Sequence, residues 1–439
     1  MVGVGMIFDE TYRPFFENAQ QTPLVDRRFG LCEVVLKAIA SRTGERAEAF
    51  RKLAAAQVAT VSGDAAKGGV SAWPIPGERL DEFRSYCGPR AIEEMLQEPL
   101  DFVCVATPDQ RHMEAAQAAL RAGKHVLIEK PSVLRLSELD QLQDLAIQNE
   151  RLVRVVYHKL FDPDHKKLRT FVADGQLRHV NNGYCSLLEP KQISGSQFAE
   201  WIAGRNPGTY VAVHYIKLID FTFGGRLKTV MCTGQRGIVG AANGNTWDST
   251  QLRLIYEYED GRDAAFDIHT SWVTPDNFPG YVEQEVQFRF DNGVWNSHGR
   301  RRGVECTVEG KTPLQIKNTM NNHYNGKFLE PHGARSQRGY GIEVLEQFAR
   351  EVAYVEFGVE GTRASRLASV RKLNYADLSA DRQVVAAVEA MEAILARHAA
   401  GVPDCVVRVN GSSGGGSSSG LVLFAPGGGT PEILYQPQV

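Results

Sequence analysis

The chain has 439 residues, of which 43% are hydrophobic and 23% are charged, and its formal net charge is −3 at pH 7. These values are typical of a globular protein with a sizeable core, and they speak against a nucleic-acid partner. No apolar run approaches the roughly 20 residues that span a bilayer, and the first residues show no secretory signal. We therefore expect a cytoplasmic protein with no membrane partner.

The seven cysteines are dispersed without a C-x-x-C pair, and the eleven histidines show no spacing such as H-E-x-x-H. An odd and scattered set of cysteines is typical of reduced thiols in a cytosolic protein. The absence of ligand spacing predicts no structural metal.

Short apolar runs alternate with helical patterns over the first 160 residues, as in "LDFVCVAT" followed by "PDQRHMEAAQAALRAG". This alternation predicts right-handed βαβ units around a parallel sheet. The runs are continuous, as expected for strands that are covered on both faces. We predict an α/β chain whose N-terminal Rossmann domain occupies residues 1–157.

Strand-like segments follow one another after about residue 180, and turn signals such as "EDGRD" and "DNG" lie between them. Consecutive strands with short turns predict an antiparallel sheet, hence an α+β second domain over residues 158–405. Residues 406–439 form a Gly/Ser-rich linker and tail, in which Asn410 to Gly420 has the composition of a flexible linker. The apolar piece "LVLFAP" that follows either docks as a strand or is foreign to the native protein.

Gly3 and Gly5 lie at the first strand-to-helix junction, and Met6 and Ile7 open the helix. Glycines at this point let the backbone approach a pyrophosphate at the N-terminus of the helix. Phe8 takes the third small position of the G-x-G-x-x-G/A fingerprint, so the motif alone also suits an ordinary tight turn.

Ser41, Arg42 and Thr43 follow the second strand, where an NAD-binding chain usually carries an acidic residue. Two hydroxyls and a guanidinium suit the 2′-phosphate of NADP, so we favour NADP over NAD. The alternative is that Thr43 caps the next helix and that Arg42 is solvated.

The fourth and fifth strands end in "ATPDQRH" and "EKP", at the sheet edge where a Rossmann fold binds its ligand. An ammonium held there can stabilise alkoxide charge on a substrate. The alternatives are a surface salt bridge of little energy for the Glu-Lys pair and a solvent-facing histidine in the helix. The candidate cofactor-binding residues at these two strand ends are Ala106, Thr107, Pro108, His112, Glu129 and Lys130.

The sequence "AGKHVLIEKP", together with "GVG", Ser41-Arg42 and "VATPDQRH", resembles the Gfo/Idh/MocA oxidoreductase family. The resemblance implies a Rossmann domain followed by a domain with a large, mostly antiparallel sheet. It also implies hydride transfer between NAD(P) and a sugar, cyclitol or related polyol, with Lys130 as the catalytic lysine. A homodimer or homotetramer is expected on the same ground.

The stretch "TYVAVHYIKLIDF" matches the histidine helix of that family, so His214 is the implied base for the hydroxyl proton. Tyr210 and Lys217 stand where the family often has aspartate, and both become candidate substrate contacts. On a regular helix the three residues share a face, and Lys217 would then lower the pKa of His214. The alternative for His214 is a buried ring paired with a backbone carbonyl.

His158, Lys159 and Asp162 lie in "YHKLFDPDHKKL", where the first domain hands over to the second. In the family this junction lies near the substrate, which makes the three residues candidate substrate contacts. The alternative is that they are solvated linker residues.

Two other functions remain open from the sequence. One is an NAD-dependent glycosidase-like hydrolase that oxidises its substrate transiently, and the other is a non-catalytic dinucleotide-binding protein. Phe8 and Tyr210 lean toward the second, whereas the presence of both Lys130 and His214 favours an enzyme with a small carbohydrate or polyol substrate.

Overall fold

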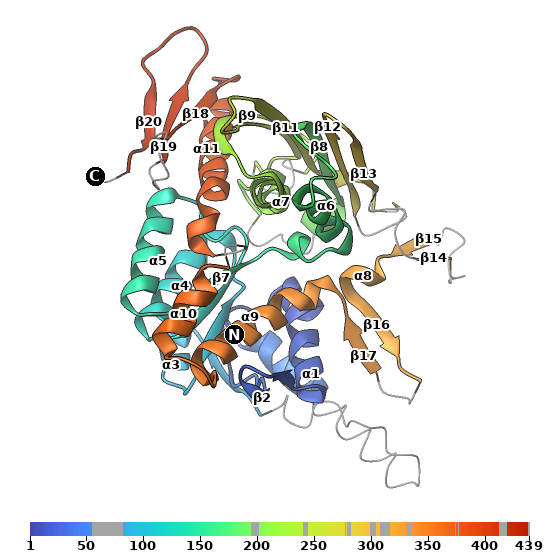
Figure 1. Cartoon of the computed structure of the whole chain (residues 1–439), viewed down its shortest axis with the longest axis vertical. Coiled ribbons are helices and arrows are strands. Elements are labelled where there is room, and N and C mark those ends of the chain that lie inside the picture. Colours follow the sequence, from blue (N-terminus) through green and yellow to red (C-terminus); the bar gives the residue numbers. More distant parts are fainter. Residues whose placement is uncertain are drawn as a thin grey trace. The chain divides into compact units, whose positions relative to one another are not determined.

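A computed structural model describes residues 1–54, 82–194, 202–239, 245–276, 278, 282–298, 304–307, 317–331, 335–373, 375, 377–411 and 419–437. They form two compact units (Figure 1). The first unit comprises Met1–Ser132, Asp140–Phe161 and Asn322–Ala380, and the second comprises Val133–Leu139, Asp162–Asn321 and Asp381–Val439. The first unit therefore takes in residues 322–380, which the sequence had grouped with the second domain.

The first unit is built on a parallel sheet that a single residue joins across its middle. Val2 forms parallel bridges to Ala40 on one side and to Val105 on the other. The resulting strand order, β4-β3-Val2-β5-β6-β7, is that of a dinucleotide-binding Rossmann sheet. The predicted parallel sheet is confirmed; its strands are β3 (Ala38–Ser41), β4 (Arg84–Cys87), β5 (Phe102–Val105), β6 (His125–Glu129) and β7 (Val153–Val156).

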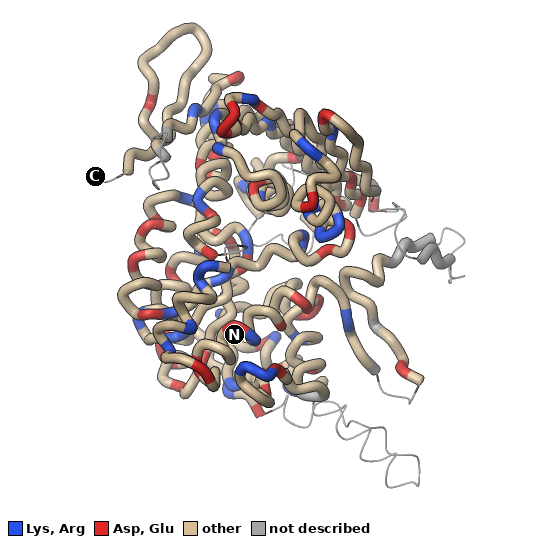
Figure 2. The backbone as a smooth tube through the Cα atoms, in the orientation of Figure 1, with Lys and Arg blue, Asp and Glu red and all other residues tan. Residues whose placement is uncertain are grey.

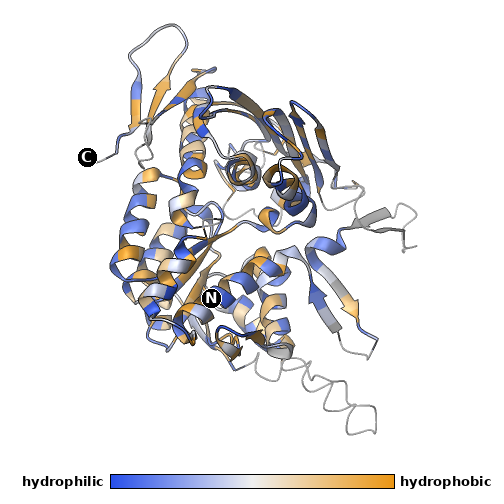
Figure 3. Ribbon diagram, viewed as in Figure 1, coloured by the Kyte–Doolittle hydropathy of each residue, from blue (hydrophilic) through white to orange (hydrophobic). Residues whose placement is uncertain are grey.

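Helices follow these strands as the alternating pattern predicts. All residues of β6 and β7 are buried, as expected for strands that helices cover on both faces. Figure 3 colours most of β7 as hydrophobic. The elements of this part are η1 (Phe8–Tyr12), α1 (Arg13–Gln21), the hairpin β1 (Leu24–Asp26) and β2 (Gly30–Cys32), a helix over 45–54, α3 (Ala91–Met95), η2 (Asp109–Arg111), α4 (His112–Arg121), α5 (Leu136–Gln148) and η3 (His158–Leu160).

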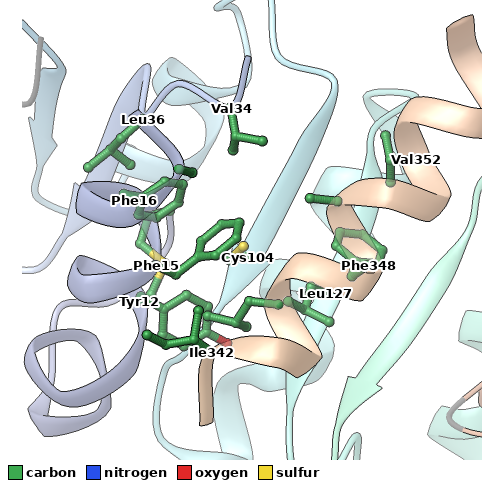
Figure 4. Close-up of a cluster of buried hydrophobic side chains, with 14 of the residues drawn as sticks. Tyr12, Phe15, Phe16, Val34, Leu36, Cys104, Leu127, Ile342, Phe348 and Val352 are labelled. Carbon is green, nitrogen blue, oxygen red and sulfur yellow. The ribbon is translucent and has the colours of Figure 1, made fainter. Parts of the chain in front are cut away.

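Residues 322–380 complete the first unit with α8 (Asn322–Asn325), β16 (Gly326–Leu329), β17 (Arg335–Arg338), α9 (Tyr340–Phe357) and α10 (Arg363–Arg371). Figure 4 shows the core that α9 shares with α1 and the sheet: Phe15, Phe16, Cys104, Leu127, Ile342 and Phe348 meet there. Apolar burial of this kind is the main stabilising term for the added segment.

Arg154 of β7 ties the same segment to the sheet by charge. Its side chain is 1% exposed, and its guanidinium donates to Glu351 at 2.8 Å, to Asp377 at 3.0 Å and to the carbonyl of Val370 at 2.8 Å. A buried arginine with two carboxylates and a carbonyl has partners for its charge and for its donors.

The second unit contains a nine-stranded sheet in the order β13-β12-β8-β11-β10-β9-β18-β19-β20. All neighbouring pairs are antiparallel except β11 and β8, so the predicted large, mostly antiparallel sheet is confirmed. Burial alternates along β11. Its first six strands are β8 (Val180–Pro190), β9 (Arg226–Gln235), β10 (Ser249–Glu257), β11 (Asp263–Thr274), β12 (Glu283–Phe290) and β13 (Val294–His298), and the pair β14 (Val304–Thr307) and β15 (Lys317–Met320) lies outside it.

The C-terminal segment extends this sheet with β18 (Val406–Gly411), β19 (Ser419–Phe424) and β20 (Glu432–Tyr435). The "LVLFAP" piece therefore docks as a strand. Residues 412–418 of the predicted linker lie outside the described residues. The helices of the second unit are α6 (Pro163–Ala173), η5 (Gly208–Ala212), α7 (Val213–Phe223) and α11 (Arg382–Ala399), and η7 (Leu378–Asp381) precedes α11.

Figure 2 shows both signs of charge interspersed along the described backbone. Among the described residues, no helix combines the length and apolar character that crossing a membrane requires. Within the same residues, no group of three or more His, Cys, Asp or Glu is placed to hold a metal ion.

We expect Arg154→Met to lower the free energy of unfolding by about 3–5 kcal/mol, because it leaves the buried Glu351 and the half-buried Asp377 without their cation. Urea denaturation followed by the fluorescence of the folded state measures the loss. Arg253→Met is the control: its pair with Asp267 is exposed, and losing such a pair costs about 1 kcal/mol or less. Equal losses in the two variants would contradict the structural role of Arg154.

Candidate functional site

The glycine turn after Val2 has the geometry that a bound pyrophosphate requires. Gly3 has φ +87°, and a Cβ there would lie 2.3 Å from the carbonyl oxygen of Ala106. A Cβ on Gly5 would meet nothing within 4 Å, and the helix begins at the next residue. A tight turn, open space and a helix N-terminus together fit a dinucleotide phosphate.

Phe8, which breaks the fingerprint, is buried in the core of the first unit. Its ring packs edge-on against Phe50 with the ring centres 5.2 Å apart. The chain is wound as a π-helix over Phe8–Tyr12 before α1 begins, a local irregularity that occurs frequently at functional sites. The bulky residue therefore fills the helix interface and leaves the open space at Gly5 intact.

Arg42 and Thr43, in the loop after β3, are exposed to solvent. Ser41 instead forms a hydrogen bond within the loop. The Ser41 hydroxyl accepts the N–H of Gly44 at 3.1 Å. Arg46, in the helix that follows this loop, donates from Nη1 to the carbonyl oxygen of Val4 at 3.3 Å and so ties that helix to the glycine turn. Sequence reasoning missed Arg46, although a second arginine four residues after Arg42 was a usable signal.

His112 joins the loops that follow β5 and β6. Its Nδ1 lies 2.7 Å from the carbonyl oxygen of Pro131, and its Nε2 lies 2.9 Å from that of Thr107. Burial lowers the pKa of the ring, and the charge of Asp109 opposes this. The solvent-facing alternative for His112 is wrong, because the ring is buried between the two loops.

Glu129 and Lys130 are both buried at the end of β6, with 6% and 9% exposure. The Tyr12 hydroxyl donates to Oε1 of Glu129 at 2.9 Å, and the backbone N–H of Lys130 also bonds this carboxylate. Burial raises the pKa of Glu129 to about 7, opposed by the Lys130 charge. The alternative of a surface salt bridge is wrong, since neither side chain is on the surface.

His158 and Lys159 are buried in the first unit, so the solvated-linker alternative is wrong for these two residues. The His158 ring meets Tyr324 edge-on at 5.7 Å, and Nζ of Lys159 lies 5.9 Å from the ring centre of Tyr340. Burial lowers the pKa of His158 to about 3, and the charges of Lys130 and Lys159 add to the effect. The charges of Lys130 and Lys159 thus both act on the His158 ring.

Tyr324 and Tyr340 escaped the sequence analysis because they come from the segment assigned to the other domain. No local signal marks them. Asp162, in contrast, caps α6 in the second unit, where its carboxylate accepts the N–H of Asp164 at 3.0 Å.

His214 lies one residue into α7 and is 9% exposed. The Tyr210 ring lies 6.1 Å from that of Trp272. Lys217 is fully buried, with Nζ 3.8 Å from Oδ2 of Asp220. Burial raises the pKa of Asp220 to about 6, and the Lys217 charge opposes the rise. Sequence reasoning missed this carboxylate, which the i,i+3 spacing from Lys217 could have indicated.

The start of the His214 helix is held by hydrogen bonds to α11. Oδ1 of Asn206 accepts the N–H of Thr209 at 2.7 Å, and its Nδ2 donates to Oε1 of Glu392 at 2.9 Å. A Cβ on Gly208 would lie 2.5 Å from the sulfur of Met391. This close approach fixes the turn that precedes His214.

Residues 1–157 match the model of an oxidoreductase family with an NAD-binding Rossmann fold, Gfo/Idh/MocA. An uncharacterised oxidoreductase of Escherichia coli, YdgJ, is 36% identical over 81 residues, which cover 18% of this chain and 23% of that protein. The scyllo-inositol 2-dehydrogenase (NADP(+)) IolW of Bacillus subtilis is 31% identical over 91 residues, 20% of this chain and 25% of that protein. The chain thus matches about a quarter of the length of these curated relatives.

Among solved structures, apo scyllo-inositol dehydrogenase from Lactobacillus casei aligns with a TM-score of 0.59 at 15% identity. The alignment covers 93% of this chain and 96% of that one, and it shows that the fold is shared. A further structure of that enzyme holds NAD(H) and scyllo-inositol.

We expect Glu129→Gln to stabilise the protein at pH 8 and to have little effect near pH 4.5. The folded pKa of Glu129 is raised from 4.5 to about 7, so its favourable contribution is complete below pH 4.5 and is lost as pH rises through 7. At about 1.4 kcal/mol per pH unit the gain above pH 7 is about 3 kcal/mol. Thermal unfolding of both proteins at several pH values measures the difference.

Glu356→Gln is the control of opposite sign. The hydrogen bond from His125 lowers the pKa of Glu356 to about 2, so its ionised form stabilises the fold above pH 4.5 and the benefit is lost as pH falls through 2. This variant is therefore expected to be destabilised at pH 8. A Glu129→Gln stability difference that is the same at pH 5 and pH 8 would rule out the raised pKa.

Proposed function

We propose that the chain, whose residues 1–157 match the Gfo/Idh/MocA oxidoreductase model, is an NAD(P)-dependent oxidoreductase acting on a CH–OH group. Its substrate is a sugar, cyclitol or related polyol. The observation that carries the proposal is the buried ammonium of Lys130 at the carboxyl end of β6, in the same unit as the glycine turn. The crevice at the carboxyl ends of the strands is where a Rossmann fold places its ligand.

The cofactor is held by backbone groups of the glycine turn and by the strand-end loops. When bound, the nicotinamide accepts or supplies the hydride. Arg46 joins the predicted set through its bond to Val4, and His112 acts indirectly by fixing the loops at Thr107 and Pro131. The proposed cofactor-binding residues are Gly3, Gly5, Met6, Ile7, Ser41, Arg42, Thr43, Arg46, Ala106, Thr107, Pro108, Glu129 and Lys130.

Lys130 donates a hydrogen bond to the reacting oxygen and stabilises the negative charge that develops there. Its buried setting strengthens this interaction relative to the same contact in water. The lowered pKa of His158 keeps that ring neutral, so it offers the substrate a hydrogen bond without a second positive charge. Lys159 is proposed as the other positive charge near the substrate, in addition to Lys130.

His214 takes or returns the hydroxyl proton, a role that suits imidazole near neutral pH. Tyr210 is proposed as a substrate contact beside Trp272. Lys217 is fully buried beside Asp220. Its proposed role is to stabilise α7 rather than to bind substrate. Asp162 likewise acts through the α6 cap that it forms.

Inositols are the first substrates to test, because the Bacillus subtilis and Lactobacillus casei proteins are named for scyllo-inositol. NADP is the preferred cofactor in this proposal, which rests on Arg42 and on the second arginine at position 46. The homodimer or homotetramer stays a prediction.

We expect Lys130→Met to lower kcat by about 10²–10³-fold, since it removes the donor that stabilises charge in the transition state. The assay follows reduced-nicotinamide absorbance with scyllo-inositol, myo-inositol and a panel of sugars. Lys37→Met replaces an exposed lysine of the same unit and is expected to retain wild-type turnover. Unchanged turnover in Lys130→Met would remove the assigned role.

We expect Arg42→Ala to weaken NADP binding by about tenfold or more while leaving the NAD affinity nearly unchanged, because charge-assisted bonds to the 2′-phosphate are lost. Fluorescence titration with each cofactor gives the dissociation constants without a substrate. Arg121→Ala, an exposed arginine at the end of α4, is the matched control. A wild-type preference for NAD would refute the assignment of the Ser41–Thr43 loop.

A further inference from the structure

Tyr12 is a buried tyrosine for which the proposed reaction has no direct use. It is the last residue of the π-wound segment, it is fully buried, and Figure 4 shows its side chain extending from this helix into the core cluster. Its hydroxyl does not end in apolar surroundings, because it donates to Oε1 of Glu129 on β6 at 2.9 Å. The bond joins residues 117 positions apart in the chain.

The carboxylate that receives this bond belongs to the residue before Lys130, and the charge of Lys130 acts on it. Glu129 accepts from Tyr12 and from the backbone N–H of Lys130, and the charge of Lys130 favours its ionised form. A carboxylate removed from water stays ionised only when hydrogen bonds and a counter-charge replace its hydration. Tyr12 supplies one of these hydrogen bonds from an element that contains neither Glu129 nor Lys130.

We infer that Tyr12 is a positioning residue for Lys130: its hydroxyl holds Glu129 ionised and in place, and Glu129 in turn keeps the Lys130 ammonium charged and oriented. The inference rests on the proposed role of Lys130 for its functional meaning. The physical link between Tyr12 and Glu129 can be tested without that role.

Several other titratable groups face Glu129. Lys130 favours the ionised carboxylate, whereas Asp109 of η2 disfavours it. Cys104 of β5 and Tyr324 of α8 stay neutral, because burial raises the pKa of Cys104 to about 12 and that of Tyr324 above its usual value. Among these neighbours, Tyr12 is the one whose change to phenylalanine removes a hydrogen bond without removing a charge.

The test is an infrared titration of the protonated carboxyl band between pH 5 and 9, in which Glu129→Gln identifies the band. We expect a wild-type midpoint of about 7. Tyr12→Phe keeps the buried ring and loses the hydroxyl, so the midpoint is expected to rise by about one pH unit or more. Lys130→Met is expected to raise it as well, which provides a second variant that does not alter the helix.

Tyr375→Phe is the matched control. It also removes a tyrosyl hydroxyl from a buried carboxylate in the same unit, since Tyr375 donates to Oε1 of Glu351 at 2.6 Å. The Glu129 midpoint is expected to stay unchanged in this variant. A midpoint that does not move in Tyr12→Phe, or that moves equally in Tyr375→Phe, overturns the inference.

The consequence for Lys130 has its own readout in the pH profile of kcat for the polyol that the wild type turns over. Tyr12→Phe is expected to move the acidic limb upward by the same amount as the infrared midpoint and to recover turnover at higher pH. An infrared shift without a shift in the profile overturns the positioning role. Absence of turnover in the wild type bears on the proposed function alone, because the infrared result needs no substrate.

Discussion

The backbone hydrogen bonds of the first three residues hold the candidate site together. The N–H of Val2 donates to the carbonyl of Cys104 at 2.8 Å, and the N–H of Gly3 donates to that of Ala40 at 2.9 Å. These bonds join a two-stranded piece and a three-stranded piece into one parallel sheet. They also press Gly3 against Ala106, so the position of the glycine turn is set by the same contact that closes the sheet.

Two further contacts connect this junction of the sheet with the end of β6. The helix that begins after Gly5 carries Tyr12 to Glu129, so one helical segment connects the glycine turn with the end of β6. His112 links the loops after β5 and β6 in a similar way. Lys130 therefore lies between two hydrogen-bonded residues, Glu129 and Pro131. Their partners, Tyr12 and His112, come from elements other than β6.

The sequence predicted the features that local pattern determines. Continuous apolar runs predicted the parallel sheet, because strands covered on both faces need no alternation, and consecutive strand-like segments with short turns predicted the antiparallel one. Chain position alone placed Ala106 and Lys130 at the carboxyl ends of two strands, where the structure has them after β5 and β6. The same reasoning could not place residues 322–380, whose bond to the sheet through Arg154 and Glu351 spans 197 positions.

The contacts that individual side chains make were the other feature that the sequence could not predict. Helical spacing predicts that Lys217 shares a face with His214, and the sequence alone did not show that its buried ammonium also lies 3.8 Å from Oδ2 of Asp220. A flexible four-carbon side chain can carry its ammonium to a carboxylate one turn away, and residue spacing alone does not show which partner it reaches. Tyr12 was not considered at all, because an aromatic residue in an apolar helix looks like core until its hydroxyl is seen to reach a carboxylate.

The electrostatics of the Lys130 region explain why such a hydroxyl matters. A buried ammonium acts strongly on a developing oxyanion, since little water screens it, but burial also disfavours its charge. Glu129 offsets that cost only while it is ionised, and burial has brought its own pKa to about 7. Near neutral pH a single hydrogen bond is then enough to shift the ionisation of Glu129, and with it the counter-charge available to Lys130. The Tyr12 hydroxyl donates that bond.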